Sequence, residues 1–404
     1  MIGVFFLADK INLKKIGTEL CRILLGALIG AVCGGIGTLF SKAIQFVTAF
    51  RGEHGWILYL LPLGGILTVV IYKLCKTQGI GTSNALRSAV DEKEPPASLF
   101  PAIFSGTVIS HLLGASAGKE GATIQLGSVV SSLISKIFSV DEDTRRILAV
   151  CGMGGMFSAV FGTPGGAFVF AIEIFKRPRF GLKASLPTLV SCVSAFFVAE
   201  FLGAHAERFP LETLPALSFD SLLKTAVIGV AVGIVALVFC KLLHTSEKAA
   251  HKFIANPFVR AIIGSALIIL LTHLVGNNDY NGGGIFVIER IFESETVHPA
   301  AFLLKIIFTV ITVASGFKGG EIVPSLFIGA TSGGLFSQIL GFSPSFGAAT
   351  GMAAIFAAVT NCPIASFVMC MEMMGAEGAV FFLVSSLTAH FIAKKVCLFS
   401  PDAA

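Results

Sequence analysis

The chain has 404 residues, of which 54% are hydrophobic and only 13% are charged, and its mean hydropathy is +0.86. A soluble protein carries roughly a quarter charged residues, so this composition excludes an ordinary soluble fold. The net charge of +5 gives no basis for nucleic-acid binding. The sequence therefore predicts an all-α protein that crosses a membrane several times.

The N-terminal segment, residues 1–19, opens with a short apolar run that meets its first charge at Asp9. This run is too short for a secretory signal, so we expect the segment to stay in the cytoplasm. Basic clusters at 10–15, 176–183 and 394–395 favour the cytoplasmic side by the positive-inside rule. Both termini are therefore expected inside.

Apolar stretches recur along the chain at 23–40, 56–74, 226–243, 261–275 and 302–314. Some reach the roughly 20 residues that a straight span requires, while others are much shorter. The chain also contains 44 glycines, which favour short, tilted or broken helices inside a membrane. We expect an irregular helical bundle rather than a row of regular spans.

One sequence pattern occurs in each half of the chain. Residues 152–160 read GMGGMFSAV, and residues 351–359 read GMAAIFAAV. Two long copies of one unit in an apolar chain indicate a transporter whose substrate site lies between its halves. Pro164 and Glu173 follow the first copy, and Pro363 and Glu372 follow the second. The two prolines are 199 residues apart (363 − 164), and so are the two glutamates (372 − 173).

Further matched positions extend this repeat in the same order along the chain. They predict a first membrane repeat at 20–202, a linker at 203–219 and a second membrane repeat at 220–400, with no C-terminal cytoplasmic regulatory domain. The linker is rich in Pro, Glu and His, which indicates an extramembrane position. The matched glycines are Gly26 with Gly229, Gly30 with Gly233, Gly79 with Gly282, and Gly127 with Gly329.

Two acidic residues occur where a charge at membrane depth is costly and marks a pathway. Glu120 and Glu321 each lie in a glycine-rich break just before an apolar run. A helix that starts there directs unpaired N–H groups and its dipole at an anion, and Thr82 with Ser83 open a further helix in the same way. Such a site prefers a small anion. An ionised carboxylate there occupies the anion position and a protonated one leaves it, which couples anion to proton movement.

Glu173 and Glu372 differ from this pair, because each lies about nine residues into a helix that starts at a proline. We interpret these two residues as structural hydrogen-bonding groups. The nine cysteines occur singly in apolar surroundings, and neither C-x-x-C nor a histidine pair at ligand spacing occurs. No metal site and no cofactor are predicted.

Together these motifs resemble those of the CLC superfamily of chloride channels and anion/proton antiporters, from about Gly26 to the C-terminus. The family's G-S-G-I-P is similar to residues 79–83, its G-[KR]-E-G-P to 118–122, and its G-x-F-x-P to 320–324. The resemblance implies an inverted repeat of two homologous halves, and a homodimer with a pore in each subunit. It implies Glu120 as the gating and proton-coupling glutamate and Glu321 as a second carboxylate on the path. The anion-binding residues that it implies are Gly79, Ile80, Gly81, Gly118, Lys119, Gly121, Gly320, Ile322, Val323 and Phe399.

The chain departs from the family pattern at several of these positions. Ile80 replaces the serine that contacts the anion, and Phe399 replaces a tyrosine hydroxyl. Ile322 replaces an aromatic residue of the third motif, directly after the unusual Glu321. Ile174 stands where chloride/proton members have an inner glutamate. A site that has lost both hydroxyl ligands keeps its backbone donors but suits chloride poorly.

One branch, the bacterial fluoride/proton antiporters, resembles this chain in its apolar replacement of the serine, its G-G-E-I-x-P third motif and its lack of the inner glutamate. That branch keeps the tyrosine and has threonine where Val323 stands. The resemblance implies fluoride export in exchange for protons across the inner (plasma) membrane of a bacterium. A chloride channel or a chloride/proton antiporter of the same superfamily is the alternative, and Ile174 favours a channel. The expected partners are fluoride or chloride, protons, the lipid bilayer and a second copy of the chain.

Residues 114–118 also match the G-x-S-x-G motif of hydrolases around Ser116. That motif requires a preceding strand in a soluble α/β sheet, together with a later acid and histidine. The segment before it, 103–113, is instead an apolar run typical of the membrane. An enzyme is therefore not predicted.

Overall fold

The computed structural model describes residues 13–88, 94–175, 181–204, 206–394 and 396–398. In these ranges the chain forms sixteen α-helices and two short 3-10 helices, with no extended strand. The helices of the first half are α1 (Leu13–Glu53), η1 (Gly55–Leu60), α2 (Leu61–Leu74), α3 (Thr82–Ser88), α4 (Leu99–Leu113), α5 (Glu120–Ile137), α6 (Glu142–Phe161), α7 (Pro164–Glu173) and α8 (Gly181–Phe201). Those of the second half are α9 (Phe219–Phe253), α10 (Pro257–Val275), α11 (Ile285–Ser294), α12 (Ala301–Ala314), α13 (Ile322–Ile339), α14 (Pro344–Thr360), α15 (Pro363–Met374), η2 (Ala376–Gly378) and α16 (Ala379–Ala393).

Seven helical segments of the described chain are long and apolar enough to cross a membrane, and five further apolar helices are shorter. The two longest helices, α1 with 41 residues and α9 with 35, exceed the apolar stretches seen in the sequence. At about 1.5 Å per residue each is longer than the roughly 30 Å of bilayer hydrocarbon. The prediction of an all-α polytopic membrane protein with short and irregular helices is confirmed.

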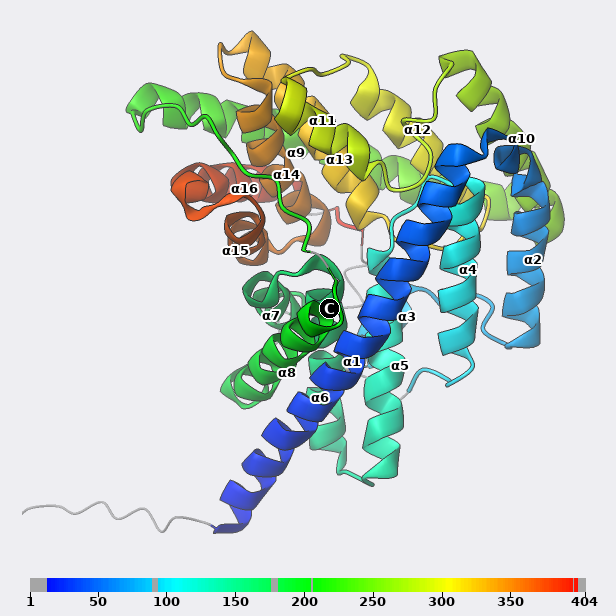
Figure 1. The fold of residues 1–404 in the computed structure, drawn as a ribbon, viewed down its shortest axis with the longest axis vertical. Coiled ribbons are helices and arrows are strands. Elements are labelled where there is room, and N and C mark those ends of the chain that lie inside the picture. The colour runs from blue at the N-terminus through cyan, green and yellow to red at the C-terminus, as the bar shows by residue number, and fades with distance from the viewer. Residues whose placement is uncertain (1–12, 89–93, 176–180, 205, 395, 399–404) are drawn as a thin grey trace, which may run out of the picture.

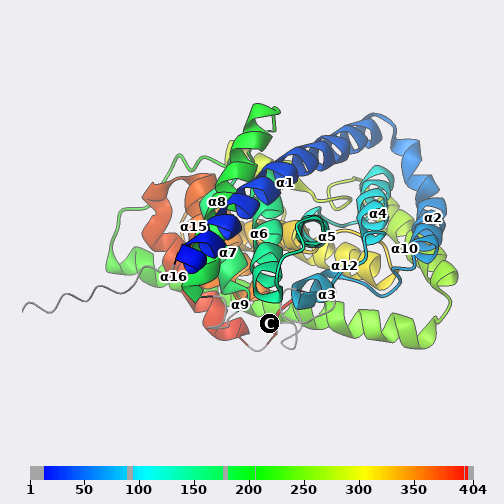
Figure 2. The same cartoon turned by 90° about the horizontal axis from the view of Figure 1, so that it is seen from below.

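The two halves place equivalent helices side by side in space. Figure 1 shows α7 next to α15 in the middle of the molecule, and α2 next to α10 at one edge, and both pairs are in contact. Figure 2 shows α1 and α9, the first helix of each half, along opposite faces. This arrangement is the one expected when two copies of a unit pack in opposite orientation.

The matched glycines allow the same close helix packing in both halves. A Cβ atom on Gly26 of α1 would lie 2.7 Å from the carbonyl oxygen of Pro187 in α8. A Cβ on Gly233 of α9 would lie 3.1 Å from the Cα of Ala389 in α16. Small residues therefore let α1 pack on α8 and α9 pack on α16 at backbone distance, which is a common way to join helices in membranes.

The repeated pattern forms the buried centre of each half. Residues 152–160 lie in α6 and residues 351–359 in α14, and all of them are buried. A Cβ on Gly152 would lie 2.8 Å from the Cβ of Ser131 in α5, and one on Gly351 would lie 2.9 Å from the Cα of Gly333 in α13. The pattern is thus rich in small residues because α6 and α14 pack tightly against α5 and α13, the helices whose first turns carry the candidate site.

The linker between the two halves makes contacts with the rest of the protein. Residues 206–218 have no regular structure, yet Phe209 is buried and its N–H donates to the carbonyl oxygen of Met373 at 2.9 Å. Part of the linker therefore packs against the protein, and it supplies one side chain to the candidate site.

Candidate functional site

The glycine-rich breaks of the two halves meet directly. The N–H of Gly118 donates to the carbonyl oxygen of Gly320 at 2.7 Å, and the N–H of Gly320 donates to the carbonyl oxygen of Gly118 at 2.6 Å. A Cβ on Gly320 would lie 2.9 Å from the backbone nitrogen of Glu120, and one on Gly121 would lie 3.1 Å from the Cα of Gly320. Glycine is required at these positions because backbone packs against backbone at the junction.

The helices that follow this junction start with different side chains. Helix α5 begins at Glu120 with Lys119 at its N-cap, whereas α13 begins at Ile322 with Glu321 at its N-cap. The acidic residue is therefore displaced by one position between the two helix starts.

Glu120 crosses from one half of the protein to the other. Its side chain is fully buried, and its Oε2 accepts a hydrogen bond from the backbone N–H of Val323, in the first turn of α13, at 3.2 Å. Its Oε1 is buried and has no hydrogen-bond partner among the described residues. A buried carboxylate oxygen without a donor is costly, so this oxygen is available to a proton or a bound group.

Lys119 points away from this contact and forms an ion pair with the linker. Its Nζ lies 3.0 Å from Oε1 of Glu207, and both side chains are mostly buried. Sequence reasoning missed Glu207, because the Pro- and Glu-rich segment around it was interpreted as extramembrane. The only signal available was an acidic residue in the segment that joins the two halves.

The loop before α3 contacts the first turn of α5. Thr82 Oγ1 donates to the carbonyl oxygen of Gly121 at 3.4 Å, and Gln125 Nε2 donates to Thr82 Oγ1 at 3.3 Å. The N–H of Gly81 donates to Asn84 Oδ1 at 3.0 Å, so this backbone donor already has a protein partner. The first motif therefore lies beside the second, although one of its expected anion donors is occupied.

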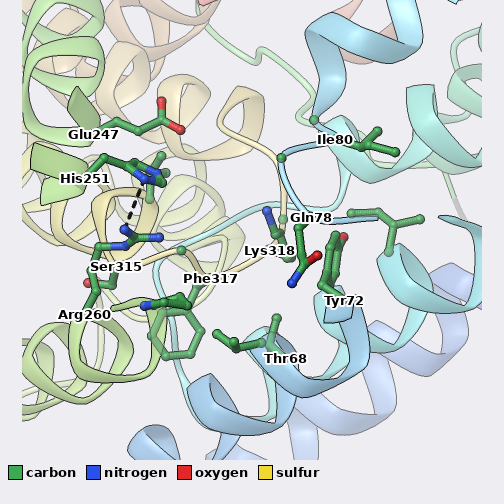
Figure 3. A pocket seen from close by; sticks show the side chains of 18 of the residues that line it. Thr68, Tyr72, Gln78, Ile80, Glu247, His251, Arg260, Ser315, Phe317 and Lys318 are labelled. Atoms are coloured by element: carbon green, nitrogen blue, oxygen red, sulfur yellow. Dashed lines mark hydrogen bonds between the residues drawn. The ribbon is translucent and has the colours of Figure 1, made fainter. Parts of the chain in front are cut away.

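A cavity of about 400 Å³ lies between this loop and the second half of the chain. It brings Gly79, Ile80 and Gly81 together with Glu321, as the sequence predicted for one site. Lys318, Gln78 and Ile80 are among its lining residues (Figure 3). Glu120 does not line the cavity, whereas Gln125 and Gly319 do. Of the two predicted glutamates, Glu321 thus faces the cavity, and Glu120 is enclosed at the junction.

Two of the remaining predicted anion-binding residues lie at this junction. Ile322 and Val323 are buried in the first turn of α13. Phe399 lies outside the described residues, but the preceding Leu398 lines a second cavity of about 150 Å³ together with Glu321 and Thr82.

Glu173 and Glu372 bind helix starts of the opposite half. Glu372 accepts from the N–H groups of Gly165 and Gly166 at 2.9 and 2.7 Å, at the start of α7. Glu173 accepts from the N–H groups of Ile364 and Ala365 at 3.2 and 2.7 Å, at the start of α15. The interpretation of these two residues as structural hydrogen-bonding groups is confirmed.

The hydrolase alternative does not fit the geometry around Ser116. Its hydroxyl lies 3.0 Å from Thr309 Oγ1, and its N–H donates to Thr312 Oγ1 at 2.9 Å. The element before it is the helix α4 rather than the strand that a nucleophile elbow requires. The serine joins the two halves of the molecule.

The family model described as voltage gated chloride channel matches residues 64–394, so the chain belongs to this family. Members of the family are channels and transporters rather than enzymes. A relative from Pseudomonas syringae pv. tomato, described as a chloride/fluoride channel protein, is 28% identical over 91% of this chain and 83% of its own. A relative from Vibrio vulnificus, described as an H(+)/Cl(-) exchange transporter ClcA, is 26% identical over 96% of this chain and 90% of its own.

Solved structures show the same architecture. A CLC-type fluoride/proton antiporter superposes with a TM-score of 0.89 at 29% identity, covering 94% of this chain and 97% of its own. A slow cyanobacterial Cl-/H+ antiporter superposes with a TM-score of 0.79 at 21% identity, covering 92% and 94%. The inverted-repeat fold that the motifs implied is confirmed.

Proposed function

We propose that this protein exchanges fluoride for protons across the plasma membrane of a bacterium, as a homodimer with one pathway in each subunit. The observation that carries the proposal is the contact of Glu120 with the first turn of α13. One carboxylate oxygen accepts from Val323 N–H while the other has no partner among the described residues. When the Glu120 carboxylate is ionised, it accepts the hydrogen bond from the N–H donor at this helix start. When it is protonated, it leaves this donor, which can then bind an anion.

The preference for fluoride rests on the side chains around this position. Ile80 supplies no hydroxyl ligand, so the backbone N–H groups at the helix starts carry the binding. Glu321 places a second carboxylate on the cavity side, which suits a small basic anion that travels with protons. The 0.89 TM-score to a fluoride/proton antiporter supports the same choice.

The test uses purified protein in liposomes that are loaded with fluoride and diluted into fluoride-free buffer, which imposes a fluoride gradient. The expected result is proton movement against the direction of fluoride movement, measured in parallel with a fluoride electrode and an internal pH dye. An equal chloride gradient is expected to drive much less proton movement. Free chloride passage without proton movement would contradict the proposal.

Chloride transport by the same pathway is the second candidate. Ile174 is buried and apolar where chloride/proton members have an inner glutamate, and this feature favours a channel. In the liposome experiment a chloride channel would collapse the gradient without proton movement, whereas a chloride/proton antiporter would move protons under the chloride gradient.

A further inference from the structure

Two cavities share a pair of acidic residues, of which only Glu321 belongs to the transport site already described. The larger cavity and the smaller one share four lining residues, Thr82, Glu247, Val313 and Glu321. Two of these are acidic and come from different helices, since Glu247 lies in α9 and Glu321 precedes α13. Carboxylates gathered on one cavity border in a membrane protein mark a path for protons.

Glu247 lies where this path reaches the surface. It is an exposed residue near the C-terminal end of α9, a helix too long for the hydrocarbon layer. The last part of α9, from Lys241 to Lys252, carries six ionisable side chains and therefore extends into water or the interface. The other end of the larger cavity reaches buried Gln125 and Ile103. The cavity thus connects an exposed carboxylate to the interior.

The charged groups around Glu247 come from three elements. His251 and Arg260 line the same wall, where Arg260 Nη1 lies 3.1 Å from His251 Nδ1, and Lys318 projects from the opposite side (Figure 3). Glu247, Arg260, Lys318 and Glu321 all line the larger cavity. His244 faces the smaller cavity. Arg260 is buried and its Nε has no partner among the described residues, so a cation without a full set of partners lies on the same cavity wall as Glu247.

We propose that Glu247 is the proton relay between bulk water and Glu321, an inference that rests on the proposed fluoride/proton exchange. A proton from bulk water binds the Glu247 carboxylate. The Glu247 O–H bond then breaks as its proton passes to water in the cavity, and that water gives one of its own protons to the Glu321 carboxylate. Glu247 is left ionised and is protonated again from bulk. The cations Lys318 and Arg260 favour anions in the same cavity, so fluoride and protons approach Glu321 through one opening.

The test compares proton and fluoride fluxes of Glu247→Gln with those of the unchanged protein in liposomes. Without the relay, protons must reach Glu321 directly from bulk, so coupled exchange is expected to fall by roughly 100-fold at alkaline pH. It should recover as the pH on the cavity side is lowered, because direct protonation depends on proton concentration. Glu247→Asp keeps a carboxylate and is expected to restore most of the exchange. Glu247→Ala serves the same purpose if the glutamine variant aggregates.

Two further variants identify where the relay acts. Glu53→Gln removes an exposed carboxylate outside both cavities and is expected to leave the pH profile unchanged. In a Glu321→Gln background, Glu247→Gln should add no further loss, because the two residues act in series. Additive losses would overturn the relay alone. A Glu247→Gln pH profile identical to that of the unchanged protein would do the same, provided that the unchanged protein couples fluoride to proton movement. Absence of coupling in the unchanged protein would overturn the proposed function, and the relay with it.

Discussion

Two pairs of helix starts bring the halves of this protein together, and they use their glutamates differently. At the starts of α7 and α15 the arrangement is symmetric, since Glu372 and Glu173 each accept two N–H groups from the opposite half. At the starts of α5 and α13 it is asymmetric. There Glu120 accepts one N–H group, from Val323, and keeps one oxygen without a partner among the described residues.

The difference separates structural carboxylates from those available for transport. An ionised carboxylate that accepts two N–H donors at a helix start is stable and has no reason to move. A buried carboxylate with one unpartnered oxygen gains from binding a proton or from leaving its position. The asymmetry follows from a displacement by one residue, which places Lys119 and Glu321 at the equivalent N-caps.

The largest effect is expected from Glu120→Gln. The amide oxygen can still accept from Val323 N–H, but the side chain no longer binds and releases a proton. Proton movement coupled to fluoride should fall by about 100-fold, at the low end of losses for proton-transferring groups. Liposome flux assays with parallel fluoride and pH readouts measure this change.

The same variant should change stability little, because it removes a charge that is only partly satisfied. Its thermal midpoint in detergent, compared with that of the unchanged protein, is the control. A large fall in the midpoint together with intact proton coupling would make Glu120 a structural residue like Glu372.

Glu372→Gln should show the opposite pattern. The amide offers one acceptor oxygen where the carboxylate offered two, so one N–H at the start of α7 loses its partner. Loss of a charge-assisted hydrogen bond is expected to lower the free energy of unfolding by about 2 kcal/mol. The ratio of protons to fluoride ions should stay unchanged in the protein that folds.

Denaturant-dependent unfolding in detergent gives the stability change, with Glu377→Gln at a nearby exposed position as the matched control. Glu173→Gln should reproduce the loss from the other half of the molecule. If the two substitutions lower the free energy of unfolding by different amounts, the starts of α7 and α15 contribute unequally to stability despite their similar hydrogen bonds.

The sequence was informative wherever glycine and acidic residues recur in order. The glycine-rich breaks around Gly118 and Gly320 predicted two helix starts, and the structure adds that the two breaks contact each other through their backbones. The displacement of the acid from Glu120 to Glu321 was also visible in the aligned halves. Both are local patterns, and the helix starts that they describe depend on few distant contacts.

Contacts between distant segments could not be predicted in this way. The partner of Lys119 lies 88 positions along the chain, at Glu207, in a segment whose composition indicates exposure. The reciprocal pairing of Glu173 and Glu372 spans about half of the chain and depends on how the halves pack. Glu247 lies on the cavity wall only because α9 extends beyond the apolar stretch that the sequence indicates.

The smallest of these effects is expected from Glu207→Gln, which tests the N-cap beside Glu120. Lys119 loses its countercharge but keeps a hydrogen-bond acceptor in the amide, so the expected loss is about 1 kcal/mol. A buried charge without its partner costs more than no charge, so adding Lys119→Met should recover part of this loss. Unfolding of both variants in detergent measures the two steps. If Lys119→Met deepens the loss instead, the ammonium group is held by the α5 junction itself rather than by Glu207.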